Sequence, residues 1–451
     1  MMRILGYRFF RIVVGVVAFV PLTGFSQSLP QSVEIALSQY PTIVAAQSRV
    51  KAAGHQIAEA QSQHWPQLAW QGTNNVYSGV APSPFEPNNT WIQSPAISLN
   101  IWSGGRIQSQ VQRARAVHDT RRQEERITRD EVAYLVVDAY LNWVRLEQLK
   151  AIAQQNLAIH QKLTGDVSKI AQIDQGRRID VTQAMVRAEN ARLTLEQLVS
   201  EHEIAGQRLQ RMLLGSLPSQ PSGYKDIPGQ IPASLNAALQ RVNSQHPVIA
   251  QREAQVRTAQ AEVAGARSQF LPSVDLSYQK QTTEGLGQGD YVTQLNVRVP
   301  IFDGGRAHSA TRSAYADLDV AQQDLRESEL ILRENLSNAW SEYSIAKQRI
   351  ILGEQQVNNA AELARGYDQQ FRIGRRSLLD LLTIQDNLFG YRVNLTNATF
   401  EKQVAKAKIL AILNELATAY TEKVVATDAP QAKVSGGLVQ TSNPIRPVVQ
   451  P

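Results

Sequence analysis

One short motif occurs twice in this chain of 451 residues, and this repetition limits what the chain can fold into. The sequence IWSGGR ends at Arg106 and the sequence IFDGGR ends at Arg306, which is an offset of 306 − 106 = 200 residues. The similarity extends upstream, where the stretch 40–71 aligns with 246–277 at an offset of 206 residues. The chain is therefore an internal duplication, and each half should form the same succession of elements.

The duplication sets the expected boundaries of the chain. We expect a first repeat at 27–215 and a second at 233–422, joined by a linker at 216–232 that is rich in Pro, Gly and Ser. Residues 423–451 contain four prolines and no helical periodicity, which predicts a disordered tail.

The first 26 residues are typical of a secretory signal peptide. Three arginines (Arg3, Arg8 and Arg11) precede the apolar run Ile12–Leu22, and small residues follow it. The run is shorter than the roughly 20 apolar residues that a transmembrane helix requires. We therefore expect cleavage after residue 26 and a location in the cell envelope or outside the cell.

Each repeat contains two segments in which apolar and polar residues alternate. In 291–302 the apolar Leu295, Val297, Val299 and Ile301 alternate with polar residues, and 273–279 and 97–101 behave in the same way. Alternation with a period of two predicts strands with one apolar face. Such strands fit half of a soluble sandwich or a membrane barrel whose apolar face meets lipid.

The length of the segments and their aromatic residues favour the barrel. The segments span about 8–12 residues, which suits tilted membrane strands, and Trp65, Trp70, Trp91 and Trp102 lie in or beside the first pair. Four strands are too few to close a membrane barrel, because the smallest have about eight. A barrel must therefore be shared between subunits, and the sequence predicts an oligomer.

Long helical stretches follow each Gly-Gly pair, from Gly105 to about Ile159 and from Ala307 to about Arg349. They carry few large apolar residues, so we expect them to pack against neighbours as in a coiled coil. At each junction between strand and helix we predict a structural role for the glycines, which adopt dihedral angles and allow close approach that other residues do not. These junction residues are Gly104, Gly105, Arg106, Gly304, Gly305 and Arg306.

The motif IFDGGR before a long helix, together with FRIGRRSLLDLLTIQDNL from Phe371, resembles the TolC family of outer-membrane factors. The resemblance covers about 31–422 and implies a mainly α fold with a small β part. Three chains would share a twelve-stranded barrel in the outer membrane, which a long α-helical barrel continues into the periplasm. It further implies a passive exit duct that works with a periplasmic adaptor and an inner-membrane ABC transporter or proton-driven pump. The stretch GRRSLLDLLTIQ resembles the branch that serves type I protein secretion, for example of a large adhesin, and multidrug efflux is the alternative.

The resemblance also implies a constriction at the periplasmic tip. Gly374 and Arg376 match the family's turn, and Asp380 matches an acidic ring that faces the axis. In the first repeat Gly176 matches the turn, but Asp180 follows it by four residues, whereas Asp380 follows Gly374 by six. We therefore expect a first turn two residues shorter, with arginines gathered at both turns (Arg177, Arg178, Arg375 and Arg376).

The sequence lacks the motifs of the common enzyme classes. There is no phosphate-binding loop, no nucleophile elbow and no cysteine, and the seven histidines are scattered. We expect no enzyme activity, cofactor or metal. The net charge of +6 falls to +3 without the signal arginines, which is too weak to indicate nucleic acid binding. A periplasmic adaptor or a structural coiled-coil protein would lack the duplicated strands.

Overall fold

The structure is a computed structural model and describes residues 28–76, 89–215, 217–218, 221–222, 224–281 and 290–421. The expected signal peptide and tail lie outside these residues. So do 77–88 and 282–289, which include most of two stretches, 72–91 and 283–289, whose turn-forming residues predict external loops between paired strands. At the edges of the first stretch the structure has strand instead, because β1 continues to Val76 and β2 begins at Asn89.

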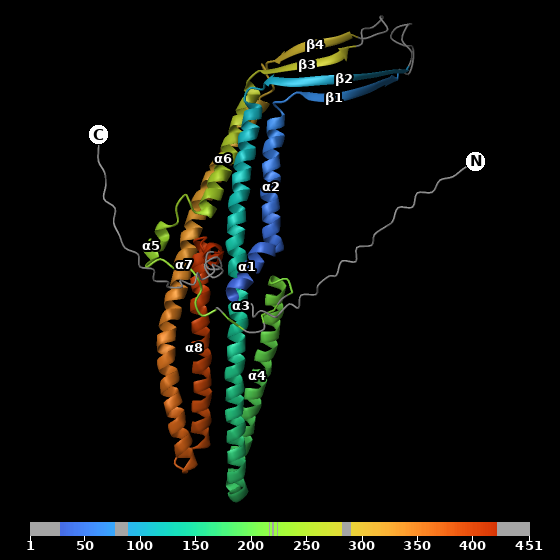
Figure 1. Ribbon diagram of the computed structural model, residues 1–451. Helices are drawn as coiled ribbons and strands as arrows, with labels where there is room; N and C mark the ends of the chain where they lie inside the picture. The colour runs from blue at the N-terminus through green and yellow to red at the C-terminus, as the bar shows by residue number, and fades with distance from the viewer. Residues whose placement is uncertain are drawn as a thin grey trace, which may run out of the picture.

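The molecule is a long rod with a small sheet at one end and two helical turns at the other (Figure 1). The first repeat contains α1 (Leu29–Gln39), α2 (Pro41–Ser62), β1 (Gln67–Val76), β2 (Asn89–Trp102), α3 (Arg106–Ile173), a short 3₁₀ turn η1 (Gln175–Arg177) and α4 (Arg178–Met212). The second contains α5 (Leu235–Gln240), α6 (Pro247–Arg267), η2 (Ser268–Phe270), β3 (Ser273–Gln281), β4 (Asp290–Arg298), α7 (Arg306–Arg372) and α8 (Leu378–Ile412). The order of α-helices and strands is the same in both repeats, whereas the 3₁₀ turns η1 and η2 fall at different places.

The four strands form one antiparallel sheet in the order β1-β2-β3-β4. Its register places apolar residues opposite one another, as in the row Leu68, Ile97 and Tyr278, and all three are at least 40% exposed. The other face is polar, and there the Asn100 amide donates to the Asp275 carboxylate at 2.7 Å. Strand β4 ends at Arg298 rather than at Phe302 as the alternation predicts, and Pro300, just beyond it, has no N–H to pair in a sheet.

The long helices continue well past the ends that the sequence indicates. Helix α3 reaches Ile173 instead of Ile159, and α7 reaches Arg372 instead of Arg349, because Gly165 and Gly353 do not interrupt them. A glycine costs roughly 1 kcal/mol inside a helix, and packing within the hairpin offsets this cost. A Cβ on Gly353 would lie 3.3 Å from Leu395 Cδ1, so the glycine allows α7 and α8 to approach closely.

The largest apolar core surrounds the middle of α3. Residues of α1, α4, α8 and the inter-repeat segment pack there, and the Tyr140 hydroxyl donates to the Ser222 carbonyl at 3.1 Å. A second core joins the lower parts of α3, α4, α7 and α8. Within the described residues, no helix is both long and apolar enough to cross a membrane.

Candidate functional site

The two strand–helix junctions have nearly the same backbone geometry. Gly104 and Gly105 have φ angles of +64° and +87°, and Gly304 and Gly305 have φ angles of +69° and +85°. These are left-handed conformations, which cost a side-chain-bearing residue about 1–2 kcal/mol. Gly104 also lacks space, because a Cβ there would lie 2.7 Å from Leu271 Cβ.

The residue before each glycine pair helps to begin the next helix. The Ser103 hydroxyl accepts a hydrogen bond from the Ile107 N–H at 3.2 Å, and the Asp303 carboxylate accepts one from the Ala307 N–H at 2.8 Å. Serine and aspartate are common acceptors for the free N–H groups at helix starts, so these two residues are a local sequence signal for the start of each long helix. Arg106 donates to Gln63 at 3.2 Å, whereas Arg306 lies 3.9 Å from Asp303.

The turn between α7 and α8 is a Schellman motif. Gly374 has a φ angle of +75°, its N–H donates to Phe371 O at 3.0 Å, and the Arg375 N–H donates to Gln370 O at 2.9 Å. The Ser377 hydroxyl then caps α8 by accepting from the Asp380 N–H at 3.1 Å. This turn is therefore closely defined by backbone hydrogen bonds.

Arg376 connects the residues around this turn. Its guanidinium carbon lies 4.1 Å from the centre of the Tyr367 ring, its Nε donates to Gln370 at 3.2 Å, and its Nη1 lies 3.7 Å from Asp380. Arg375 is exposed. Asp380 thus has a cation beside it within the same protomer.

The turn between α3 and α4 is built differently. Gly176 lies within η1 without a positive φ angle, and its N–H donates to the Asp174 carboxylate at 3.1 Å. Arg177 lies 3.6 Å from the same carboxylate, and Arg178 is the first residue of α4 and is exposed. The ion pairs and hydrogen bonds of the Arg177 and Arg376 side chains stay within their own turns, so the turn arginines form two separate groups within one protomer.

The two turns align when the first residues of α4 and α8 are matched, and they do not align when their glycines are matched. Helices α4 and α8 begin at Arg178 and Leu378, an offset of 200, and Asp180 and Asp380 are each the third residue of their helix. Matching Gly176 to Gly374 therefore misaligns the turns by two residues. The first turn is one residue shorter between the helices (174–177 against 373–377).

Polar contacts that the sequence did not reveal connect the two hairpins above the turns. The Asp386 carboxylate of α8 lies 3.3 Å from His160 Nε2 on α3 and 3.0 Å from Arg187 Nη1 on α4. His160 is 1% exposed. No local pattern relates these residues, since more than 190 positions separate Asp386 from each of the other two.

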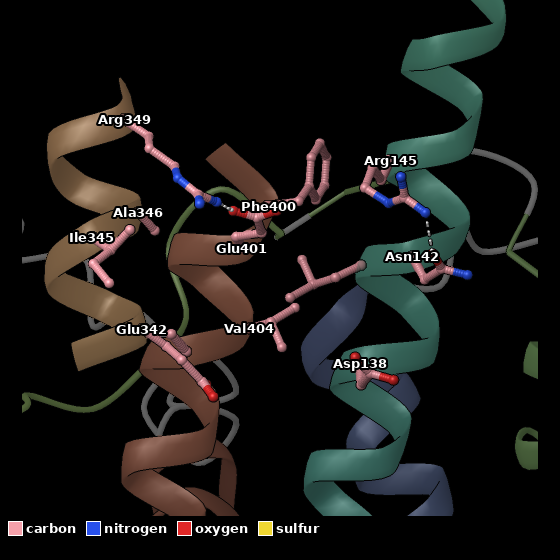
Figure 2. A pocket seen from close by; sticks show the side chains of 12 residues that line it. Asp138, Asn142, Arg145, Glu342, Ile345, Ala346, Arg349, Phe400, Glu401 and Val404 are labelled. Atoms are coloured by element: carbon pink, nitrogen blue, oxygen red, sulfur yellow. Dashed lines mark hydrogen bonds and ion pairs between the residues drawn. The ribbon is translucent and has the colours of Figure 1, made fainter. Parts of the chain in front are cut away.

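A groove of about 410 Å³ lies between α3, α7 and α8 in the middle of the rod. Figure 2 shows Asp138 and Arg145 on α3, with Phe400 and Glu401 of α8 between them and α7. Burial raises the pKa of the Asp138 carboxyl, and Arg208 and Arg145 partly oppose this effect. Arg349 pairs with Glu401 at 3.2 Å and Lys408 with Glu342 at 2.9 Å, so we assign the groove no ligand.

Comparisons with known proteins agree with the duplicated architecture. The profile of a family described as "Outer membrane efflux protein" matches residues 33–215 and 238–421. The outer membrane efflux protein BepC of Brucella suis is 23% identical over 398 residues, 86% of each chain. The cation efflux system protein CusC of Escherichia coli is 21% identical over 81% of each chain.

Solved structures show the same fold. Structures of CusC match 85% of this chain and 91% of theirs with a TM-score of 0.75 and 19% identity. The outer membrane protein VceC of Vibrio cholerae matches 86% of this chain and 96% of its own with a TM-score of 0.73 and 18% identity. The mainly helical fold with a small sheet, expected from the sequence, is confirmed.

Proposed function

The chain belongs to the outer membrane efflux protein family, and from this premise we propose that three copies form the exit duct of a type I protein secretion system. The family consists of non-enzymatic outer-membrane channels that extend into the periplasm and serve tripartite export systems. The proposal adds the homotrimer, the secreted protein cargo, an ABC transporter in the inner membrane and a periplasmic adaptor.

The α7–α8 turn is the observation that carries the proposal. Its sequence GRRSLLDLLTIQ resembles the type I secretion branch, and the turn lies at the end of the rod opposite the sheet (Figure 1). The 68 residues of α3 span about 100 Å at 1.5 Å per residue, so the turns lie far from the outer membrane. Exposed Arg375 and the half-exposed pair Arg376 and Asp380 are available there to an adaptor.

Small-molecule efflux is the second candidate, and the comparisons favour it. The names of several relatives refer to efflux, including the toluene efflux pump protein TtgC of Pseudomonas putida, 23% identical over 308 residues. Both candidates use the same duct and differ in the transporter that it serves.

The two candidates are separated by deleting the gene and measuring two properties of the same cells. Type I secretion predicts that a protein disappears from the culture medium while susceptibility to toxic compounds is unchanged, and that the wild-type gene restores the protein. Increased susceptibility with an unchanged secreted protein profile would overturn the proposal in favour of efflux.

A variant that cannot insert into the membrane is the negative control. Val297→Arg places a charge on the exposed apolar face of β4, which costs about 2–4 kcal/mol near the middle of a bilayer. It should behave as the deletion, whereas Arg298→Leu, on the other face of the strand, should retain the function.

A further inference from the structure

One face of α7 is exposed although the equivalent face of α3 is buried. Ser109, Ala116 and Thr120 of α3 are at most 7% exposed. The residues 200 positions later are exposed, and they are Ser309, Ala316 and Val320. In the single protomer, α7 therefore lacks a neighbouring element that covers the equivalent face of α3.

Helix α6 provides the cover of α3. Arg113 pairs with Glu262 at 2.8 Å and Asp119 pairs with Arg257 at 3.2 Å, both between α3 and α6. The repeat equivalent of α6 is α2, which in this protomer packs against α3, just as α6 packs against α7. Among the described elements α2 makes no close packing with α7, so an equivalent cover must come from α2 of another copy.

The described sheet also has one pair of strand edges that is joined and an equivalent pair that is not. Its register follows the offsets of 206 and 200 residues between the two repeats. Gln67 lies opposite Ser98 in β1–β2, and Ser273 lies opposite Arg298 in β3–β4, so the first strand shifts by 273 − 67 = 206 and the second by 298 − 98 = 200. In the part of the sheet that the structure describes, β1 and β4 are the unpaired edges. Unpaired edges readily add another strand.

The same offsets convert the inner β2–β3 pairing into a pairing of β4 with β1. Leu99 lies opposite Leu276, and their equivalents are Val299 and Trp70; Trp102 lies opposite Val274, and their equivalents are Phe302 and Leu68. These four equivalents are strongly exposed in the protomer, at 55%, 69%, 87% and 75% respectively.

We propose that β4, the residues that follow it, and the exposed face of α7 bind β1 and α2 of a second copy in this transferred register, with Val299 opposite Trp70 and Asp319 paired with Lys51. The proposal rests on the homotrimer proposed above and specifies its contacts. Asp319 is the equivalent of Asp119 and Lys51 that of Arg257, so the ion pair of the inner interface keeps its charges at the outer one. Both residues are exposed.

The junction glycines support the same partner. Gly104 packs tightly against Leu271 and Pro272, but a Cβ on Gly304 would meet no described atom within 4 Å. The equivalents of the packed pair are Trp65 and Pro66, and Trp65 is 70% exposed. A second copy would bring its Trp65 against Gly304 and cover both.

Disulfide crosslinking tests the register, because the chain has no cysteine of its own. Directly opposed residues of antiparallel strands have Cα atoms about 4.5–5.5 Å apart, within the range that a disulfide bridges. Val299→Cys with Trp70→Cys should give covalent dimers and trimers on non-reducing gels, and each single variant should give none through this pair. Leu99→Cys with Leu276→Cys is the matched control and should crosslink only within one chain.

A register control and a charge exchange decide the result. Val299→Cys with Leu68→Cys moves one partner by two residues and should crosslink poorly; if it crosslinks better than the proposed pair, the register is wrong. Lys51→Asp and Asp319→Lys should each weaken the trimer, and the two together should restore it. Absence of both effects in protein that is still trimeric by mass would overturn the interface but not the duct, whereas monomeric wild-type protein would overturn the assembly itself.

Discussion

Helices α3 and α7 are equivalent elements of the two repeats, but they are buried to different extents. Helix α3 buries 21 of its 68 residues, and α7 buries 10 of its 67. Helix α3 packs against α2, α4, α6 and α8, whereas the main long-helix neighbours of α7 are α6 and α8. The two helices are nearly equal in length and begin at junctions of nearly the same geometry, so we relate the difference to the position of each repeat in the protomer.

This difference indicates which surface of the chain belongs to an assembly. An exposed apolar residue is unremarkable by itself, because much of any protein surface is apolar. Leu363 is informative because its equivalent Leu163 is 5% exposed while Leu363 is 45% exposed. The duplication therefore provides an internal reference for the covered state of α7, and the following predictions test it.

We expect the largest loss of stability when a buried leucine is replaced by alanine. Leu163→Ala should destabilise the protein by about 2–5 kcal/mol, the usual cost of a large cavity, measured as a lower temperature for dissociation of the trimer on gels. Leu363→Ala should cost a comparable amount in the trimer if long helices of a second copy pack on Leu363 as those of the same chain pack on Leu163. If only Leu163→Ala destabilised the protein, α7 would remain exposed to solvent in the trimer. The buried face of α3 would then be no guide to α7.

Alanine at the junction glycines should have the next largest effect. At Gly104 it combines a left-handed backbone, costing about 1–2 kcal/mol, with overpacking against Leu271, costing about 1–3 kcal/mol. Gly304→Ala should show only the backbone cost in unassembled protein and a larger cost in the trimer. Equal, small effects of Gly304→Ala in both forms would mean that Trp65 of the neighbour does not pack there.

Asp130 provides a comparison that depends on pH. It is 4% exposed, accepts a hydrogen bond from the Ala417 N–H at 3.0 Å, and its repeat equivalent is the exposed Leu330. Burial raises the pKa of Asp130 from 3.8 to about 6, although the hydrogen bonds from Ala417 and Leu416 partly oppose the rise. The folded state therefore binds the proton more tightly, and the associated stability, up to about 3 kcal/mol, is present below pH 4 and lost as the pH rises through 6.

Asp130→Asn should remove this dependence. Relative to the wild type, the variant should become more stable between pH 4 and pH 7, measured by chemical denaturation monitored by circular dichroism. Leu330→Asn should show no such change. A stability difference between Asp130→Asn and the wild type that is independent of pH would contradict the titration of Asp130.

The smallest effects are expected at the turns. Arg376→Ser removes a contact with the Tyr367 ring and a half-exposed ion pair with Asp380, worth together about 1 kcal/mol. If these groups line the inner end of the duct, Arg376→Ser and Asp380→Ala should alter single-channel conductance and cation preference in planar bilayers. Arg375→Ser is the matched control. Unchanged conductance in both variants would leave the turn as an adaptor surface or as plain surface.

The sequence predicted the parts of the fold that depend on local patterns. The alternation in 273–279 predicted a strand because a half-buried sheet requires that period, and the Gly-Gly pairs predicted the junctions because few other residues adopt their dihedrals. The predicted helix ends near Ile159 and Arg349 were wrong, because tertiary packing overrides the weak preference of Gly165 and Gly353 and the helices continue through them. The predicted match of Gly176 with Gly374 was wrong. Both residues are glycine, but only Gly374 has a positive φ angle. The contact of His160 with Asp386 had no local signal.

The order of the strands in the sheet has a consequence for folding. Strands β1 and β2 are close in sequence and can pair as soon as they emerge. Strand β2 can pair with β3 only later, because Asn100 and its partner Asp275 are 175 positions apart. Closing so long a loop is slow, because its entropic cost must be met before the contact forms. A newly exported chain therefore spends this interval with an incomplete apolar sheet, and we expect chaperones that shield such surfaces to limit the yield of the duct.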